Sequence, residues 1–318
     1  MPDFGRKSWY ARHMDHHFIP QFYLKRWTRP DGQLSVMRRV HGQKIATADR
    51  YPAGTGYRPD LYRTDGVPEE KAQHLEVRFM SPLDNAANRA LERILAMDES
   101  EWDGEDQKAW AVFLLSLMFR NPETVTELKD VISEMWGVGI KALEAEYENR
   151  RSPGFPETFA EFIALTDPAA PQIAATNFLM STIENERLGP GLISLHWSMI
   201  RTEPNIHPFV TSDRPVVRPL PLSDPAAYIA LPVDPHTLFL ASKRWGLEKE
   251  LTTYPRPELV DNINYAVISQ AREFVWSIDK TQIDNIRKYL GEAPSKPLLS
   301  PEQREKVMRA ARTGRESA

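Results

Sequence analysis

The sequence predicts an α+β fold, in which a central helical block packs on a mixed or antiparallel sheet formed by the C-terminal half and an N-terminal strand. Apolar side chains recur at helical spacing within residues 67–190, whereas short runs rich in β-branched and aromatic residues follow within residues 191–290. Helices and strands therefore come in separate blocks, which favours α+β over an alternating α/β arrangement. Hydrophobic residues make up 41% of the 318 residues, which is enough for a substantial core.

The N-terminal part, residues 13–66, is predicted to contain a short helix, a strand and a loop. Pro20 suits the first position of a helix, because its missing amide hydrogen is not needed there. A turn signal then precedes a predicted strand over residues 33–40. Residues 49–66 are rich in Gly and Pro and have no period, so they predict a loop. We expect the strand to join the C-terminal sheet, so that residues 1–290 form a single interleaved domain.

The helical block has its most apolar stretch at residues 105–119, which is hydrophobic around most of its circumference and is expected at the centre of the core. Ser81 and Pro82 predict an N-cap and the first position of a new helix. Asn121–Pro122 should break or kink the chain before helix resumes. Two further helices are predicted to begin at residues 68 and 82. The helix after Asn121–Pro122 is predicted to run to residue 147, and two more cover residues 157–165 and 171–187.

The sheet-rich part, residues 191–290, is predicted from β-branched and aromatic runs between turn signals. Residues 291–318 are predicted to form a Pro-containing, basic C-terminal tail or helix outside the compact body. The predicted strands cover residues 192–201, 209–212, 228–233, 237–241 and 274–278, with an amphipathic helix over residues 257–271.

Composition and charge narrow the classes of function. Cysteine is absent from the sequence, which excludes a disulfide scaffold, a zinc ribbon and a thiol nucleophile. The formal charge of −4 combines +5 in residues 1–40 and +4 in residues 280–318 with −13 between them. Basic ends fit a nucleic acid or another phosphorylated substrate as partner. With no apolar bilayer span and no secretory signal, a cytoplasmic protein without a membrane partner is expected, and the oligomeric state stays open.

Three of the eight histidines, His13, His16 and His17, lie close together in the sequence. On a strand, His16 and His17 would face opposite sides. On a helix, His13 and His17 would share a face at a spacing that metal sites use. The alternative is that one imidazole is a core or capping residue hydrogen-bonded to the main chain.

Glu76 and Asp213 are the carboxylates that could complete such a site. Glu76 lies within an apolar stripe and, if it faces the core, needs a metal, an arginine or a histidine as partner. Asp213 ends a predicted strand, where it could project into a cleft or accept hydrogen bonds from turn amides. Arg120 closes the apolar helix and could reach a phosphate or satisfy the last carbonyls of that helix. The sequence contains no phosphate-binding loop, zinc-protease or nucleophile-elbow motif.

Three segments together resemble the family called Domain of Unknown Function 4238. Residues 16–24, HHFIPQFYL, are similar to its opening HHxxPxxxL pattern. Residues 119–122, FRNP, resemble the Arg-x-Pro that closes its central apolar helix, and residues 209–216, FVTSDRPV, resemble its FxTSDxPV signature. The family pattern leads us to expect a glutamate at position 84, where this sequence has Asp84. Arg214 stands where the pattern more usually has Asn. The resemblance covers nearly the whole chain except both basic ends and implies no activity.

The leading hypothesis is a metal-assisted hydrolase that acts on phosphodiesters, as a nuclease does. A divalent ion, Mg, Mn or Zn, would be held by His17, Glu76 and Asp213 and would activate a water molecule. His16 or His17 would serve as ligand or general base, and Asp213 as a catalytic carboxylate. Arg120 would hold the phosphate. The predicted substrate contacts are Ser212, Arg214 and Asn264.

Two other hypotheses stay open. In a metal-free hydrolase, His17 would act as general base oriented by Asp213, with Ser212 as nucleophile. In a non-catalytic binding or regulatory module, buried charged side chains would form a hydrogen-bonded network that fixes the helical block against the sheet. The members of that network would be His16, Glu76, Arg120 and Asp213.

Overall fold

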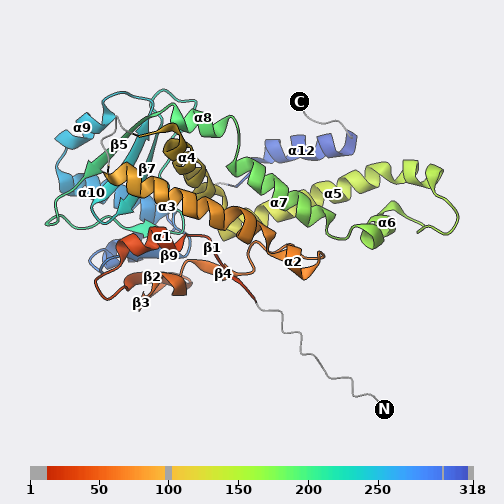
Figure 1. The fold of residues 1–318 in the computed structure, drawn as a ribbon, viewed down its shortest axis with the longest axis horizontal. Coiled ribbons are helices and arrows are strands. Elements are labelled where there is room, and N and C mark those ends of the chain that lie inside the picture. The colour runs from red at the N-terminus through yellow and green to blue at the C-terminus, as the bar shows by residue number, and fades with distance from the viewer. Residues whose placement is uncertain (1–12, 97–101, 296, 314–318) are drawn as a thin grey trace, which may run out of the picture.

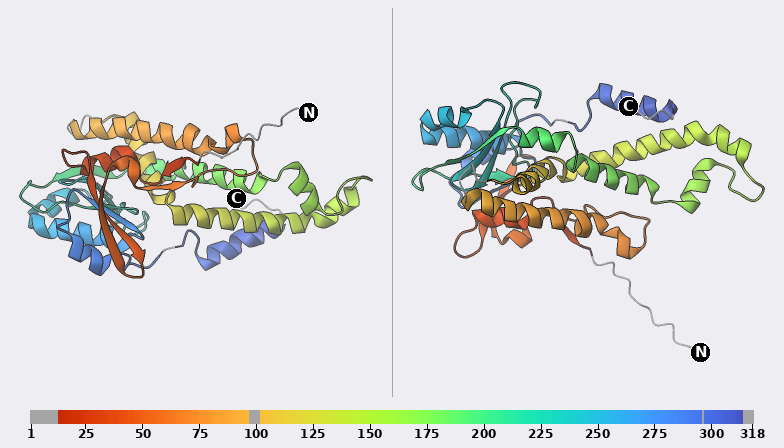
Figure 2. Two further views of the ribbon diagram at one scale, coloured as in Figure 1. Left: turned by 90° about the horizontal axis from the view of Figure 1, so that it is seen from below. Right: turned by 45° about the horizontal axis from the view of Figure 1, so that its top comes forward.

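The computed structural model describes residues 13–96, 102–295 and 297–313. These residues form an α+β body and a helical arm that extends from one side of it (Figures 1 and 2). The predicted fold class is confirmed. The arm is made of α5 (Pro122–Arg150), α6 (Phe159–Thr166) and α7 (Ala170–Ile183), and α12 (Pro301–Thr313) packs along α5.

Every strand pair among the described residues is antiparallel, and the strands form three sheets. The four-stranded sheet has the order β3-β2-β9-β6, the three-stranded sheet the order β5-β8-β7, and β1 pairs with β4. The strands are β1 (Asp15–His17), β2 (Leu34–His41), β3 (Lys44–Arg50), β4 (Tyr57–Pro59), β5 (His196–Arg201), β6 (Thr211–Ser212), β7 (Tyr228–Asp234), β8 (Thr237–Ser242) and β9 (Phe274–Ser277).

The four-stranded sheet joins the two ends of the fold. β2 pairs with β9 from Ser35 opposite Ser277 to Arg38 opposite Phe274, which confirms that the N-terminal strand joins the C-terminal strands. The predicted loop over residues 49–66 is wrong in part, because β4 interrupts it and pairs with β1. β4 is only three residues long and has no fully buried position, so it leaves no alternating pattern in the sequence.

The segment with the HHxxPxxxL pattern runs from β1 into α1 (Gln21–Leu24), which Pro20 precedes as N-cap residue. Tyr23 is completely buried, and its hydroxyl donates to the carbonyl of Pro232 in β7 at 2.6 Å. The same hydroxyl bonds to Oγ1 of Thr211 in β6 at 2.8 Å. This segment therefore holds the three-stranded and four-stranded sheets together.

The helical block consists of α2 (Glu69–Ala72), a π-helical segment (Leu75–Met80), α3 (Ser81–Ala96) and α4 (Gly104–Phe119). The predicted restart at Ser81 is wrong: Ser81 has helical angles, φ −64° and ψ −45°, and the π-helical segment continues into α3. The predicted break after α4 is confirmed, because the side chain of Asn121 caps α5 by accepting the amide of Thr124 at 3.0 Å. The buried side chains of α4 lie in the main core, as predicted.

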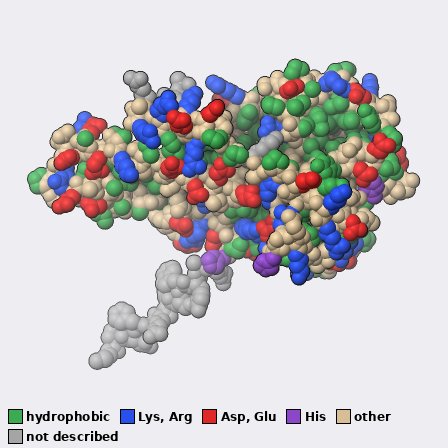
Figure 3. All heavy atoms as spheres, turned by 180° about the vertical axis from the view of Figure 1, so that it is seen from behind, with side chains coloured by type: hydrophobic (Ala, Val, Ile, Leu, Met, Phe, Trp, Pro, Cys, Tyr) green, Lys and Arg blue, Asp and Glu red, His purple; other side chains and the backbone are tan. Residues whose placement is uncertain are grey.

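The remaining helices surround the sheets. They are α8 (Leu188–Ile193), α9 (Leu247–Thr253), α10 (Arg256–Gln270) and α11 (Ile283–Tyr289). Seen from behind, hydrophobic side chains gather around a hollow in the body, whereas charged side chains of both signs are spread along the arm (Figure 3). Within the described residues, no helix is both long enough and apolar enough to cross a membrane.

Candidate functional site

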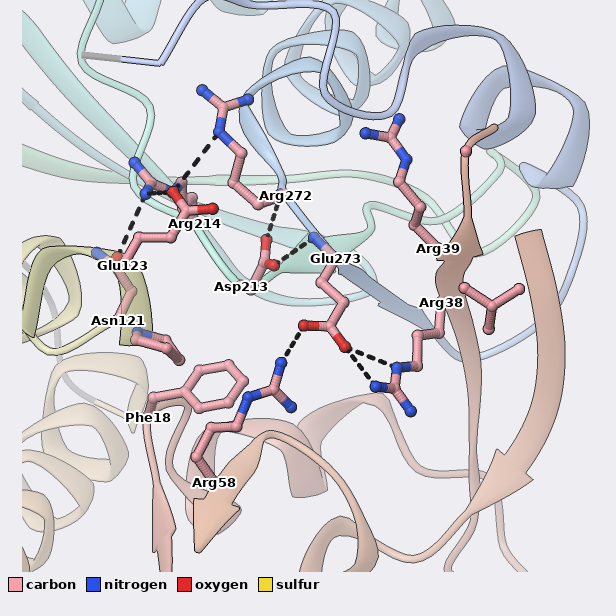
Figure 4. A pocket seen from close by; sticks show the side chains of 13 residues that line it. Phe18, Arg38, Arg39, Arg58, Asn121, Glu123, Asp213, Arg214, Arg272 and Glu273 are labelled. Atoms are coloured by element: carbon pink, nitrogen blue, oxygen red, sulfur yellow. Dashed lines mark hydrogen bonds and ion pairs between the residues drawn. The ribbon is translucent and has the colours of Figure 1, made fainter. Parts of the chain in front are cut away.

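The candidate functional site is a cleft of about 370 Å³ where β2, β4, the start of α5 and the turn before β9 meet (Figure 4). Five guanidinium groups and three carboxyl groups line it, together with Phe18 and the N-cap residue of α5. We call it the arginine cleft. Its charged residues are Arg38, Arg39, Arg58, Glu123, Asp213, Arg214, Arg272 and Glu273.

Strand pairing brings these side chains together from distant parts of the chain. Arg38 of β2 lies opposite Phe274 of β9, so the turn before β9, which carries Arg272 and Glu273, lies beside β2. Arg58 belongs to β4, which pairs with β1 of the histidine motif. The cleft therefore exists only when the N-terminal and C-terminal parts are assembled.

Glu273 is the centre of one group of ion pairs (Figure 4). One of its carboxylate oxygens is 2.7 Å from the guanidinium of Arg38, and the other accepts a hydrogen bond from Arg58. The guanidinium carbons of Arg38 and Arg58 also lie 5.2 and 5.8 Å from the ring centroid of Phe274. Cation–π contact and ion pairing together hold both arginines in place at the cleft wall.

Glu123 is the centre of the second group, at the start of α5. Its carboxylate accepts from Arg214, which also donates to the side-chain oxygen of Asn121 at 3.3 Å. Nε of Arg272 lies 3.9 Å from Glu123, and Nη1 of Arg272 donates to the carbonyl of Ala293 at 3.0 Å. Burial and the positive charge of Arg214 lower the pKa of Arg272. Positive charge on this side of the cleft therefore exceeds what Glu123 compensates.

The cleft as a whole has an excess of positive charge. With all three carboxyl groups ionised, five guanidinium groups give a formal charge of +2. Arg39 has no carboxylate partner among the described residues and bonds instead to the carbonyl of Leu290 and to Oε1 of Gln43. The N-terminus of α5, at Pro122, adds the partial positive charge of a helix end. Such a site attracts an anion, and guanidinium groups match phosphate or carboxylate oxygens in pairs.

Asp213 shapes the turn that carries two residues of the cleft. Its Oδ1 accepts the amide of Arg272 at 2.9 Å, and its Oδ2 accepts the amides of Glu273 and Phe274 at 2.6 and 3.1 Å. Burial raises the pKa of Asp213 to about 6, although the three amide hydrogen bonds pull it down. Asp213 therefore accepts main-chain amides, as one of its two expectations had it, and it also lines the arginine cleft.

Arg120 precedes Asn121, which lines the cleft, but its own side chain is completely buried in the core. Its Nη1 and Nη2 bind the two carboxylate oxygens of Asp84 at 2.6 and 3.2 Å, and Nη2 also donates to the carbonyl of His17 at 2.7 Å. Burial raises the pKa of Asp84 and of Glu76, while the charge of Arg120 lowers both. The guanidinium of Arg120 pairs with Asp84 and joins β1, α3 and α4, and Arg120 is not among the side chains that line the arginine cleft.

His16 and His17 point in opposite directions, as predicted for a strand. His16 is completely buried, stacks on the ring of Tyr62 with 5.3 Å between centroids, and accepts the amide of Tyr62 on Nδ1 at 2.8 Å. The ring of His17 lies 5.5 Å from that of Tyr57. Burial lowers the pKa of both histidines, and Arg120 lowers that of His17 further. The helical arrangement of His13 with His17 does not occur, because residues 15–17 are extended.

The three predicted metal ligands do not form one group. Glu76 and His17 lie within the electrostatic influence of Arg120, whereas Asp213 is bonded to the turn before β9. In the part of the chain that the structure describes, no three His, Asp or Glu side chains are placed to hold a metal ion. The guanidinium of Arg120 is the positive charge that acts on Glu76 and on Asp84.

The three predicted substrate contacts differ in position. Arg214 lines the arginine cleft. Ser212 is completely buried, and its hydroxyl donates to a main-chain carbonyl of α10 at 3.2 Å, so it has no access to a ligand. Asn264 is buried and bridges α10 to the segment before β6 by accepting the amide of Val210 and donating to the carbonyl of Pro208, each at 2.9 Å. Asn264 does not line the arginine cleft.

Most of the cleft was missed by the sequence reasoning. Arg38 and Arg39 form an adjacent basic pair at the end of a predicted strand, and Arg272 and Glu273 stand just before another. These positions were visible signals, because charged residues at strand ends often face a cleft. Arg58 fell in the predicted loop and carried no signal at all.

The fold and the cleft define an α+β protein with a basic site between its N-terminal and C-terminal parts. A family model described as "Protein of unknown function (DUF4238)" matches residues 15–281. The chain therefore belongs to this family, as its resemblance to the family suggested. The match begins at β1 and extends past β9, so it contains all the strands that build the cleft. No significant match exists among curated proteins or among solved structures.

Proposed function

We propose that the protein binds a small phosphorylated ligand in the arginine cleft. The observation that carries this proposal is the excess of guanidinium groups, five against three carboxyl groups, in a chain of formal charge −4. A guanidinium presents two parallel N–H groups to a phosphate, which favours recognition of that group. The volume of about 370 Å³ lies in the range of about 300–1,000 Å³ that is typical of small-molecule sites.

Binding, not catalysis, is what the side chains of the cleft support. Glu123 and Glu273 are held in ion pairs, and both oxygens of Asp213 accept main-chain amides. No imidazole and no hydroxyl group is among the side chains that line the cleft in the described residues. The metal-assisted and the metal-free hydrolase therefore stay predictions without support from this geometry.

The proposal is close to the hypothesis of a binding module whose buried charged residues form a structural network. Arg120 pairs with Asp84 and not with Asp213, and Glu76 accepts a hydrogen bond from Ser81, so these side chains have other partners than that hypothesis expects. A buried ion pair with well-formed hydrogen bonds is costly to break and so holds its elements in one arrangement. Here that arrangement keeps β1 and the start of α5 next to the cleft.

Isothermal titration with pyrophosphate tests the proposal. Arg58→Gln and Arg214→Gln each remove one positive charge from the cleft, whereas Arg287→Gln removes an exposed charge from α11 as the matched control. We expect one site per chain, weakened about tenfold or more by each cleft variant, unchanged by the control, and weakened by salt. Failure of the wild-type protein to bind, or equal affinity in all variants, would overturn the proposal. An oligonucleotide that binds independently of the cleft arginines would place a nucleic-acid partner elsewhere.

A further inference from the structure

We infer that the ligand of the arginine cleft is an anionic amphiphile, with its phosphate among the arginines and its apolar chain in an adjoining groove. This inference rests on the proposed function and adds the chemical class of the ligand. The groove has a volume of about 550 Å³. Asn121, Arg214 and Arg272 line both cavities, so the groove and the cleft meet at these three side chains.

The groove lies between the end of α4, the face of α10 and the segment that follows α11. The amide of Leu298 donates to both carboxylate oxygens of Glu127 at 3.0 Å, and the amide of Ala293 donates to the carbonyl of Ser269 at 3.0 Å. These bonds hold one wall of the groove against α5 and α10. The apolar side chains that line the groove include Met118, Phe119, Val216, Pro219, Ala266 and Leu298.

The polar side chains of the groove are largely occupied within the protein. The amides of Asn121 and Gln270 and the hydroxyl of Ser269 each donate to a main-chain carbonyl at 3.2 Å. A sugar or a nucleobase needs hydrogen-bond partners when it leaves water, because an unpaired buried polar group costs free energy. An alkyl or acyl chain needs none. The groove therefore favours an apolar occupant.

Two of the three charged side chains of the groove lie where the head of such an occupant would be. Arg214 and Arg272 stand at the junction with the cleft, and Arg218 is exposed at the groove without a hydrogen-bond or ion-pair partner in the described parts of the chain. An elongated ligand that is anionic at one end and apolar along its length complements this distribution of charge. A long-chain alkyl or acyl phosphate has this chemistry.

Isothermal titration with octyl phosphate, below its micelle concentration, and with inorganic phosphate tests the inference. Each buried methylene contributes about fourfold in affinity, so octyl phosphate is expected to bind at least about tenfold more tightly. Ala266→Trp and Pro219→Trp fill the groove from two sides and should abolish this gain without weakening inorganic phosphate. Ala142→Trp, at an exposed alanine of α5 that does not line the groove, is the control and should preserve the gain.

The outcomes separate the inference from the proposed function. If the two phosphates bind equally tightly and both depend on Arg58, the amphiphile is wrong and the phosphate site stands. If neither binds, the proposed function fails and the inference fails with it. If both groove variants have native circular dichroism and still bind octyl phosphate more tightly than inorganic phosphate, the groove is not the binding site of the octyl chain. Adenosine monophosphate binding more tightly than octyl phosphate, with loss in Ala266→Trp, would identify a nucleotide as the occupant instead.

Discussion

Arg120 and Asp84 form a bidentate ion pair that joins the end of α4 to α3, with nitrogen–oxygen distances of 2.6 and 3.2 Å. The third bond of the guanidinium, to the carbonyl of His17, brings in β1. Two of the segments that resemble the family patterns, residues 16–24 and 119–122, therefore meet at one buried side chain. Their shared task in this geometry is to fix the frame of the arginine cleft.

Replacing Asp84 by Ala should destabilise the protein strongly, because it leaves the buried guanidinium of Arg120 without its counter-charge. The expected loss in the free energy of unfolding is about 3–5 kcal/mol, measured by urea denaturation. Arg93→Ala, which breaks an exposed ion pair of the same helix, should cost less than about 1 kcal/mol. A loss for Asp84→Ala no larger than that of the control would show that the pair is not structurally important.

Tyr23→Phe should show how much one hydroxyl group, which connects the two larger sheets, contributes to the free energy of unfolding. The substitution leaves the carbonyl of Pro232 and the hydroxyl of Thr211 without their shared partner, and both are buried. We expect a loss of about 1–3 kcal/mol in the free energy of unfolding by chemical denaturation. Tyr51→Phe, at a side chain that is 58% exposed, is the matched control and should have almost no effect. Equal stability of the two variants would contradict the role of Tyr23.

His16 should make the protein less stable in mild acid. Its folded-state pKa lies below the value of about 6.5 for a free imidazole, so the unfolded chain binds more protons below that pH. The contribution of His16 is therefore complete above about pH 6.5 and declines as the pH falls towards its folded-state pKa. The stability advantage of the wild type over His16→Gln should shrink between pH 8 and pH 5 in urea denaturation. Parallel stability curves for the two proteins would refute a lowered pKa.

Glu273→Gln should tighten the binding of pyrophosphate. The substitution removes one negative charge from the cleft and releases the guanidinium groups of Arg38 and Arg58 from their ion pairs. We expect a gain of about three- to tenfold in affinity at low ionic strength that fades as salt is added. Glu250→Gln, at an exposed ion pair of α9, makes the same charge change away from the cleft and should leave the affinity unaltered. Weaker binding by Glu273→Gln would mean that ordering of the arginines matters more than their charge.

Much of the fold could be predicted, because its elements bury apolar faces that leave a period in the sequence. The strands β7 and β8 are nearly all buried and α4 has seven buried residues, and each element was placed within a few residues. β3 was missed because none of its residues is fully buried. α9 has no buried residue and α11 has one, so they leave no apolar stripe either. The position of such surface elements depends on contacts with other parts of the folded chain, which the local sequence pattern does not show.

The site was harder to predict, because its residues meet through pairing across the whole chain. Arg120 was expected at the ligand, whereas its guanidinium is buried and pairs with Asp84. Nothing in the sequence distinguishes these two fates of an arginine at the end of an apolar helix, since both depend on where Asp84 falls. Arg58 and Arg272 reach the same cleft only through the registers of β1 with β4 and of β2 with β9.

The pairing of β2 with β9 also sets an order of events during synthesis. Ser35 finds its partner only when Ser277 has left the ribosome, so the hairpin of β2 and β3 can form early but its pairing with β9 must wait for almost the entire chain. Contacts between such distant residues slow folding, because a long loop must close before they are gained. A chain that ends before β9 has neither the completed sheet nor the turn that carries Arg272 and Glu273. The arginine cleft can therefore form only after synthesis has passed β9.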